Sequence, residues 1–210
     1  MIKPLCSVVG AAFMGLAVST PSFADPSPKG LSYWDFMESF VVGDGVEMGK
    51  EPTSKGLGLP KNSVWDALSL GDGGKAIGGY TNGGESRDSI KCFRDVLGND
   101  FYVFEAQGSN ILAELIEVFV NPSKNHYLGT WISLGIAGAS PENKGVLGFD
   151  IQKAGLSEAY WVMAVDLNSK ASSSVKTKAG FDLSTIGFRD VCETPTSYNF
   201  PPYRKHPGLG

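Results

Sequence analysis

Acidic and amide side chains gather between residues 95 and 105, where Asp-Val-Leu-Gly-Asn-Asp precedes an apolar run. Calcium takes about six to eight oxygen ligands, and loops rich in Asp, Asn and backbone carbonyls supply them without regular spacing. The same residue types also favour turns, because their short side chains bond to nearby backbone groups. A plain turn is therefore the alternative, and a calcium ion here would staple loops rather than perform chemistry. The candidate ligands are Asp95, Asn99, Asp100 and Glu105, with Asp166 or Asp182 contributing from a neighbouring segment.

Aromatic side chains form the second candidate group. Sugar sites commonly pair an aromatic face with a few polar groups, and the chain has four tryptophans and seven tyrosines. Aromatic residues also favour strands and fill sandwich cores, and we expect Trp161, inside an apolar run, to be buried. Tyr127 and Trp131 lie beside a polar loop and are the candidates for an exposed binding face, together with Asn125 and His126.

The residues that catalysis requires are not arranged for it. Only two histidines occur, His126 and His206, and no Gly-x-Ser-x-Gly turn surrounds a serine. The spacing of cysteines and histidines does not match a zinc finger, and the glycine turns lack the lysine of a phosphate loop. A glycosidase needs two carboxylates facing each other across a cleft, and no spacing among the 22 acidic residues singles out a pair. We therefore expect a protein that is not an enzyme and that needs no cofactor besides the candidate calcium.

The N-terminal residues have the pattern of a secretory signal peptide. Lys3 precedes an apolar stretch of about 14 residues, which is shorter than the roughly 20 needed to span a bilayer, and small residues lead up to Ala24. Cleavage after Ala24 would remove 24 of the 210 residues and leave 186, enough for one domain with an adequate core. We therefore expect a secreted or periplasmic protein with no membrane span after cleavage.

Charge and cysteine content agree with an exported protein. The chain after residue 24 has 17 basic and 22 acidic residues and no basic run, so a nucleic-acid partner is not expected. Its two cysteines, Cys92 and Cys192, are an even number in a chain bound for an oxidising compartment, which favours a disulfide. Two separate buried thiols are the alternative.

Short apolar runs separated by Gly, Asn, Ser and Pro predict an all-β protein, an antiparallel sandwich rather than βαβ units. Residues 67–70 and 75–80 flank a glycine turn and predict a hairpin. Residues 114–120 and 161–167 are apolar enough to predict central strands covered on both faces. One short helical turn is expected at 109–115, and the proline-rich stretch 193–210 is expected to be an extended tail after a sandwich domain of residues 25–192. Further strands are predicted at 89–93, 101–105, 130–135 and 148–152.

Several phrases of the sequence resemble a known family when taken in order. They are the glycine turn after Leu68-Ser69-Leu70, the run Val103-Phe104-Glu105, Ile116-Glu117-Val118, Phe149-Asp150-Ile151, Val165-Asp166-Leu167 and the late segment Gly180-Phe181-Asp182-Leu183 with Ile186-Gly187. The set, spread over residues 57–190, resembles the bacterial exported cell-surface β-sandwich proteins. The resemblance implies a galactose-binding-like jelly roll in a protein with a surface anchor or envelope-binding partners.

The chain departs from that family at three places. Val96 and Leu97 replace a Gly-Pro pair in the turn, which counts against carrying a cation site over to this loop. Ser184 and Thr185 stand where an acidic residue is common, and no C-terminal sorting helix is present. A free periplasmic or secreted protein therefore fits better than an anchored one.

Together these patterns predict an exported, non-catalytic binding module of the envelope or extracellular space that recognises carbohydrate or a cell-surface component. Loops carry the binding residues of such sandwiches, so the regions 95–100 and 123–130 are where we expect a ligand. The alternatives are a structural or assembly protein that acts through a protein interface and, least favoured, a carboxylate-dependent hydrolase.

Overall fold

The computed structural model describes residues 30–44, 46, 56–60, 67–106, 114–140, 142–167 and 180–192. The predicted signal peptide, the predicted tail and nearly all of the predicted helical turn at 109–115 lie outside these residues. Leu115, at the end of that predicted turn, begins a β-strand.

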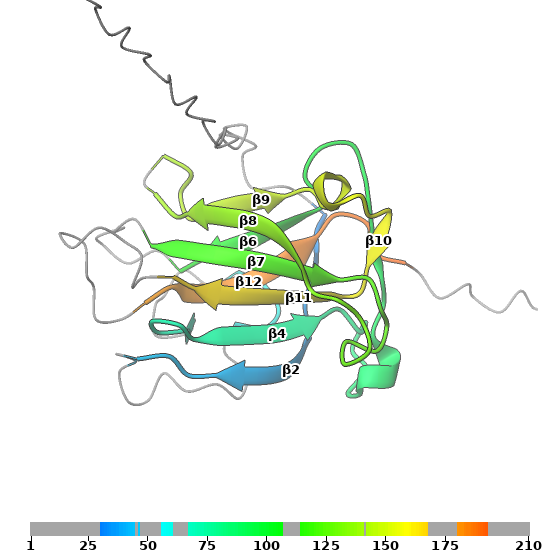
Figure 1. Cartoon of the computed structure of the whole chain (residues 1–210), viewed down its shortest axis with the longest axis horizontal. Coiled ribbons are helices and arrows are strands. Elements are labelled where there is room, and N and C mark those ends of the chain that lie inside the picture. The colour runs from blue at the N-terminus through cyan, green and yellow to red at the C-terminus, as the bar shows by residue number, and fades with distance from the viewer. Residues whose placement is uncertain are drawn as a thin grey trace, which may run out of the picture.

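Two antiparallel sheets pack face to face, which confirms the predicted all-β sandwich. Figure 1 shows the second sheet as one layer, with β6 and β12 of the first sheet behind it. The first sheet has the order β1 (Ser32–Tyr33), β12 (Asp182–Phe188), β6 (Phe101–Glu105) and β9 (Val146–Phe149), and β3 (Leu68–Ser69) also pairs with β12. The second has the order β2 (Phe36–Val41), β4 (Lys75–Gly79), β11 (Trp161–Asp166), β7 (Leu115–Asn121) and β8 (Ile132–Gly138).

Four shorter elements lie between the strands of the two sheets. β5 (Phe93–Arg94) pairs with β10 (Glu158–Ala159). Two 3₁₀ turns, η1 (Arg87–Ser89) and η2 (Ile151–Ala154), follow β4 and β9. The predicted strand at 89–93 is therefore wrong for most of its length, and the predicted strand at 148–152 ends at Phe149, because Asp150 accepts a hydrogen bond from Gln152 N and caps η2.

The core lies between the sheets. In β7, the buried side chains of Ile116, Val118 and Val120 alternate with half-buried ones on the outer face. This is the two-residue period of a strand with one face on a core. β7 and β11 are interior strands of the second sheet, as predicted. Their inner faces are buried, but their outer faces are only partly covered, so the predicted burial of both faces is wrong for the outer face.

The predicted hairpin across the glycine turn at 71–74 is wrong. β3 pairs with β12 in the first sheet, whereas β4 pairs with β2 and β11 in the second, so the turn carries the chain between layers. The reason is a close backbone approach, since Gly43 N donates to Leu70 O at 2.8 Å and a Cβ on Gly43 or Gly74 would collide with backbone atoms. Glycine is used here for space between segments rather than for a tight hairpin.

Candidate functional site

Loop 121–131 folds back at one end of the second sheet. The side chain of Asn121 shapes it from both sides, because Nδ2 donates to His126 O at 3.1 Å and Oδ1 accepts from Ser123 N at 2.9 Å. Asn125 builds the next turn, in which its Oδ1 accepts from Tyr127 N and its carbonyl accepts from Leu128 N. The polar side chains of Asn121 and Asn125 therefore fix the shape of the loop. In Figure 1 the loop lies beside η1.

The loop packs on Trp161, which is fully buried as predicted. The indole Nε1 donates to Lys124 O at 2.9 Å, and the His126 ring lies 4.7 Å from the Trp161 ring between centroids. His126 in turn lies 4.0 Å from the Tyr127 ring and 6.3 Å from the Trp131 ring. Four aromatic rings thus form one cluster around His126, and its most exposed member, Tyr127, is 67% exposed.

Two charged side chains complete this corner. Arg87 of η1 forms an ion pair with Glu38 of β2, and the Tyr127 hydroxyl donates to Glu38 Oε1 at 3.1 Å. The Arg87 guanidinium also lies 4.8 Å from the centre of the Tyr127 ring, within range for a cation–π contact. The hydrogen bond to Glu38 raises the pKa of Arg87 above its ordinary value, so the guanidinium keeps its charge at neutral pH. The Glu38–Arg87–Tyr127 network therefore joins β2, η1 and the loop at the surface.

All four residues predicted for ligand binding lie in this corner, but they differ in accessibility. Tyr127 and Asn125 are exposed and Trp131 is half-buried, whereas His126 is only 6% exposed and lies beneath Tyr127. Sequence reasoning missed Glu38 and Arg87, which are separated from the loop by 89 and 40 residues, respectively. No local pattern marks them, because only the pairing of β2 with β4 and the position of η1 bring them to the loop.

The six candidate calcium ligands do not form one site, so the predicted convergence is wrong. Asp95, Asn99 and Asp100 precede β6, whereas Glu105 is its last residue. A strand rises about 3.3 Å per residue, which places Asp100 and Glu105 roughly 16 Å apart. Asp166 and Asp182 act electrostatically on Glu105 and so belong to its end of the sandwich.

At the first end, Asp95 and Asp100 meet Asp150, and one carboxylate oxygen of each lies within 4.8 Å of the others. Asp100 is fully buried, and its two oxygens accept from Val96 N at 2.6 Å and Ile151 N at 2.7 Å. Burial raises the pKa of Asp100, and these two amide hydrogen bonds oppose the rise. Asp100 therefore staples the loop to η2 by itself, and calcium binding at this group stays a prediction.

At the opposite end, Glu105 and Glu114 form a hydrogen-bonded carboxyl pair. Burial, followed by the hydrogen bond to Glu114 and the charges of Glu114, Asp182 and Asp166, raises the pKa of Glu105 to about 10. The pair therefore holds a proton at neutral pH. The Glu105 and Glu114 carboxyl groups are in direct contact. In a glycosidase the two carboxyl groups stand about 5 to 10 Å apart, with the bond to be cleaved between them, so this pair does not match that arrangement.

Replacing Glu105 by Gln should stabilise the protein at neutral and alkaline pH. The unfolded chain loses the Glu105 proton near pH 4.5 and the folded chain near pH 10, so folding must take up a proton throughout this range. The free energy of unfolding of the native protein therefore falls as pH rises between these values. Gln cannot ionise, so the variant folds without taking up this proton. We expect E105Q to gain about 1–3 kcal/mol in free energy of unfolding at pH 8, with the gain vanishing near pH 4.5.

Urea unfolding at pH 5, 7 and 9 measures this difference. The matched control is E117Q on β7, whose wild-type carboxylate accepts a hydrogen bond from Ser133 on the outer face at 2.8 Å. In E117Q the free energy of unfolding should fall with pH as it does in the native protein. Parallel pH dependence in E105Q and the native protein would contradict a proton held by the pair.

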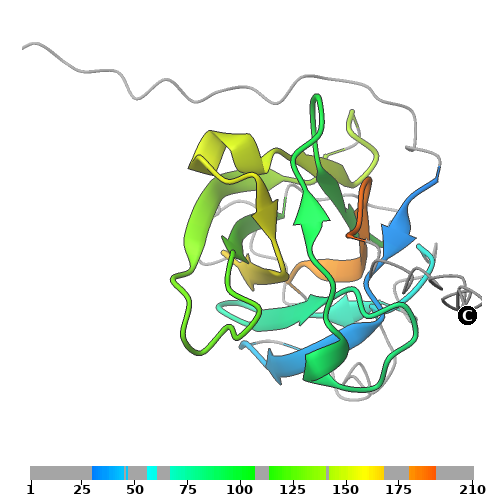
Figure 2. The same cartoon turned by 90° about the vertical axis from the view of Figure 1, so that its right-hand side faces the viewer.

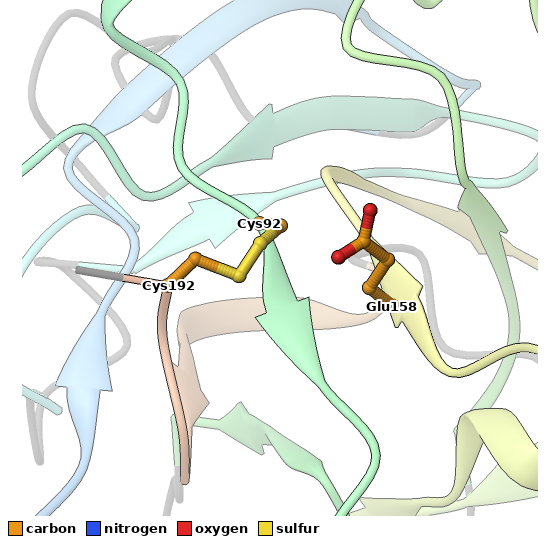
Figure 3. A group of neighbouring side chains, drawn as sticks. All are labelled: Cys92, Glu158 and Cys192. Atoms are coloured by element: carbon orange, nitrogen blue, oxygen red, sulfur yellow. A yellow bond between two sulfur atoms is a disulfide. The ribbon is translucent and has the colours of Figure 1, made fainter. Parts of the chain in front are cut away.

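The two cysteines form the predicted disulfide at the end of the sandwich that Figure 2 faces. Their Cα atoms are 5.1 Å apart, and Cys192 N donates to Cys92 O at 2.7 Å. The Glu158 carboxylate of β10 lies beside the two sulfurs (Figure 3), within 4.8 Å. Because the sulfurs are bonded to each other, this trio is a crosslink next to an acidic side chain rather than a set of thiolate metal ligands.

The chain is thus an antiparallel β-sandwich whose surface network of aromatic and charged side chains lies at one corner. Within the described residues, the structure contains no helix with the length and apolar character needed to cross a bilayer. Searches against family models, curated proteins and solved structures give no match.

Proposed function

We propose that this protein is an exported, non-catalytic module that binds carbohydrate at the corner formed by loop 121–131, β2 and η1. The Glu38–Arg87–Tyr127 network is the observation that supports this function best. A sugar ring presents apolar C–H faces and a rim of hydroxyl groups, so it needs an aromatic surface beside fixed donors and acceptors. Tyr127 and the half-buried Trp131 offer the aromatic surface. The partly exposed side chain of Arg87 offers hydrogen-bond donors, and Glu38, which is largely covered, holds Arg87 and Tyr127 in place.

Preorganisation strengthens this proposal. Glu38 lies on a strand, Arg87 lies on a 3₁₀ turn, and Tyr127 is supported from below by His126 and Trp161. A site whose groups are already held in place loses little conformational entropy when a ligand binds. Export and a partner in the cell envelope belong to the same proposal, and they rest on the N-terminal pattern and on the resemblance to exported cell-surface proteins.

A glycan array followed by titration calorimetry with the best-bound glycan tests the proposed function. We expect Y127A to weaken binding about tenfold or more, because it loses a ring contact and a hydroxyl group that orients Glu38. L128A is the matched control, because Leu128 is the adjacent residue and is 83% exposed but has no polar group. Retention of full affinity by Y127A, or an array on which the native protein binds nothing, would overturn the proposal.

A further inference from the structure

His126 is a buried polar side chain without a hydrogen-bond partner for one of its nitrogens. Its Nδ1 is inaccessible to solvent and has no partner among the described residues, although the residue as a whole is only 6% exposed. Buried side-chain nitrogens are nearly always hydrogen-bonded. An exception beneath the proposed binding surface therefore calls for a functional explanation.

The surroundings of His126 favour its neutral form. The rings of Tyr127, Trp161 and Trp131 enclose it. Two charged groups act on it, Glu38 from β2 and Arg87 from η1, and their effects oppose each other. Glu38 Oε1 already accepts from Arg87 and from Tyr127, so its charge is largely used within the network. Burial is the largest influence and lowers the pKa of His126 below 6.5.

We propose that His126 is a proton-operated latch of the carbohydrate site, in which the neutral ring holds loop 121–131 closed on Trp161 and the protonated ring releases it. The consequence for ligand binding rests on the proposed function, whereas the latch itself rests only on the packing of the loop. Release would move Tyr127 away from Glu38 and so dismantle the binding corner. The protein would hold its glycan near neutral pH and release it in weakly acidic surroundings.

The direction of the effect follows from proton linkage. The unfolded or opened loop takes up the His126 proton near pH 6.5, whereas the closed loop takes it up only at lower pH. Loop closure is therefore fully stable above about pH 6.5 and weakens as pH falls through the interval between the two values. Because one proton is involved, glycan affinity should fall by at most about tenfold per pH unit within that interval.

Acrylamide quenching of tryptophan fluorescence between pH 7.5 and 5.0 tests the latch without any ligand. We expect quenching to increase as pH falls, because loop release exposes Trp161, which is fully buried in the closed form. H126F keeps an aromatic ring without a titrating nitrogen, and H126Q keeps a polar group without one. Both should show quenching that does not change with pH. H206Q is the matched control, because it removes the only other histidine and should retain the native pH dependence.

The outcomes separate the latch from the binding function. A quenching transition that persists unchanged in both H126F and H126Q overturns the latch, and so does a native protein that shows no transition. If the transition follows His126 but no glycan binds at any pH, the latch stands and the proposed ligand is wrong. If glycan binds with the same pH dependence in H126F as in the native protein, the latch does not control the site.

Discussion

Replacing Cys92 and Cys192 by serine should lower the free energy of unfolding by about 2–5 kcal/mol. The two residues are 100 positions apart, and a crosslink closing a loop of this length removes much of the conformational freedom of the unfolded chain. The bond also secures the end of the chain segment that follows β12, since Val191 pairs with Phe93 next to it. For a domain of this size, the loss corresponds to a Tm lower by roughly 10 °C.

Thermal unfolding of the double variant, with and without reducing agent, measures this loss. Reducing agent should lower the Tm of the native protein toward that of the variant and leave the variant unchanged. E158Q is the matched control, because it alters the carboxylate beside the sulfurs and keeps the crosslink. Equal Tm values for the native protein and the double variant would show that the disulfide does not contribute to stability.

Trp161→Ala should have the second large effect, with a loss of about 3–5 kcal/mol in stability and a loss of the proposed binding site. Trp161 is fully buried, lies edge-on to Phe36 at 6.2 Å between ring centroids and supports His126 from below. Its removal also leaves Lys124 O without the indole donor. Stability and glycan affinity should therefore fall together, because the same side chain supports the outer face of the sheet and the loop above it.

Urea unfolding and calorimetry on the same preparations measure the two effects. W34F is the control for a general effect of instability, because Trp34 is equally buried but belongs to the core between the sheets. It should lose stability and keep its affinity for the glycan. If W161A does not fold, W161F provides a milder version that keeps a ring and loses the Lys124 hydrogen bond. Full affinity in a folded Trp161 variant would contradict the support assigned to this residue.

The strands that sequence reasoning located correctly are those with a strong local pattern. Phe101–Glu105 and Trp161–Asp166 are short apolar runs between turn residues, and their length and their aromatic and β-branched residues favour strands. β12 was not predicted, because Ser184 and Thr185 interrupt its apolar residues. The structure buries the whole strand, and Thr185 Oγ1 donates to Gly58 O at 2.6 Å. Its burial depends on a segment 127 residues earlier in the chain.

The candidate site likewise has one part that the sequence indicates and one part that only the structure reveals. The aromatic residues of loop 121–131 were found because they are neighbours in sequence, and their packing on Trp161 adds what the loop alone could not show. Glu38 and Arg87 were missed because each is an ordinary charged residue in its own segment.

The amino-acid sequence by itself determined that this chain forms a β-sandwich and that Cys92 and Cys192 could pair, because strand patterns can be read in short segments and cysteines can be counted. Only the tertiary structure decided which acidic residues meet. Asp100 and Glu105 are five positions apart yet lie at opposite ends of one strand, whereas Glu105 and Glu114 share a proton. The physical reason is that strand direction and register, set by pairing across the whole chain, determine where each side chain is placed.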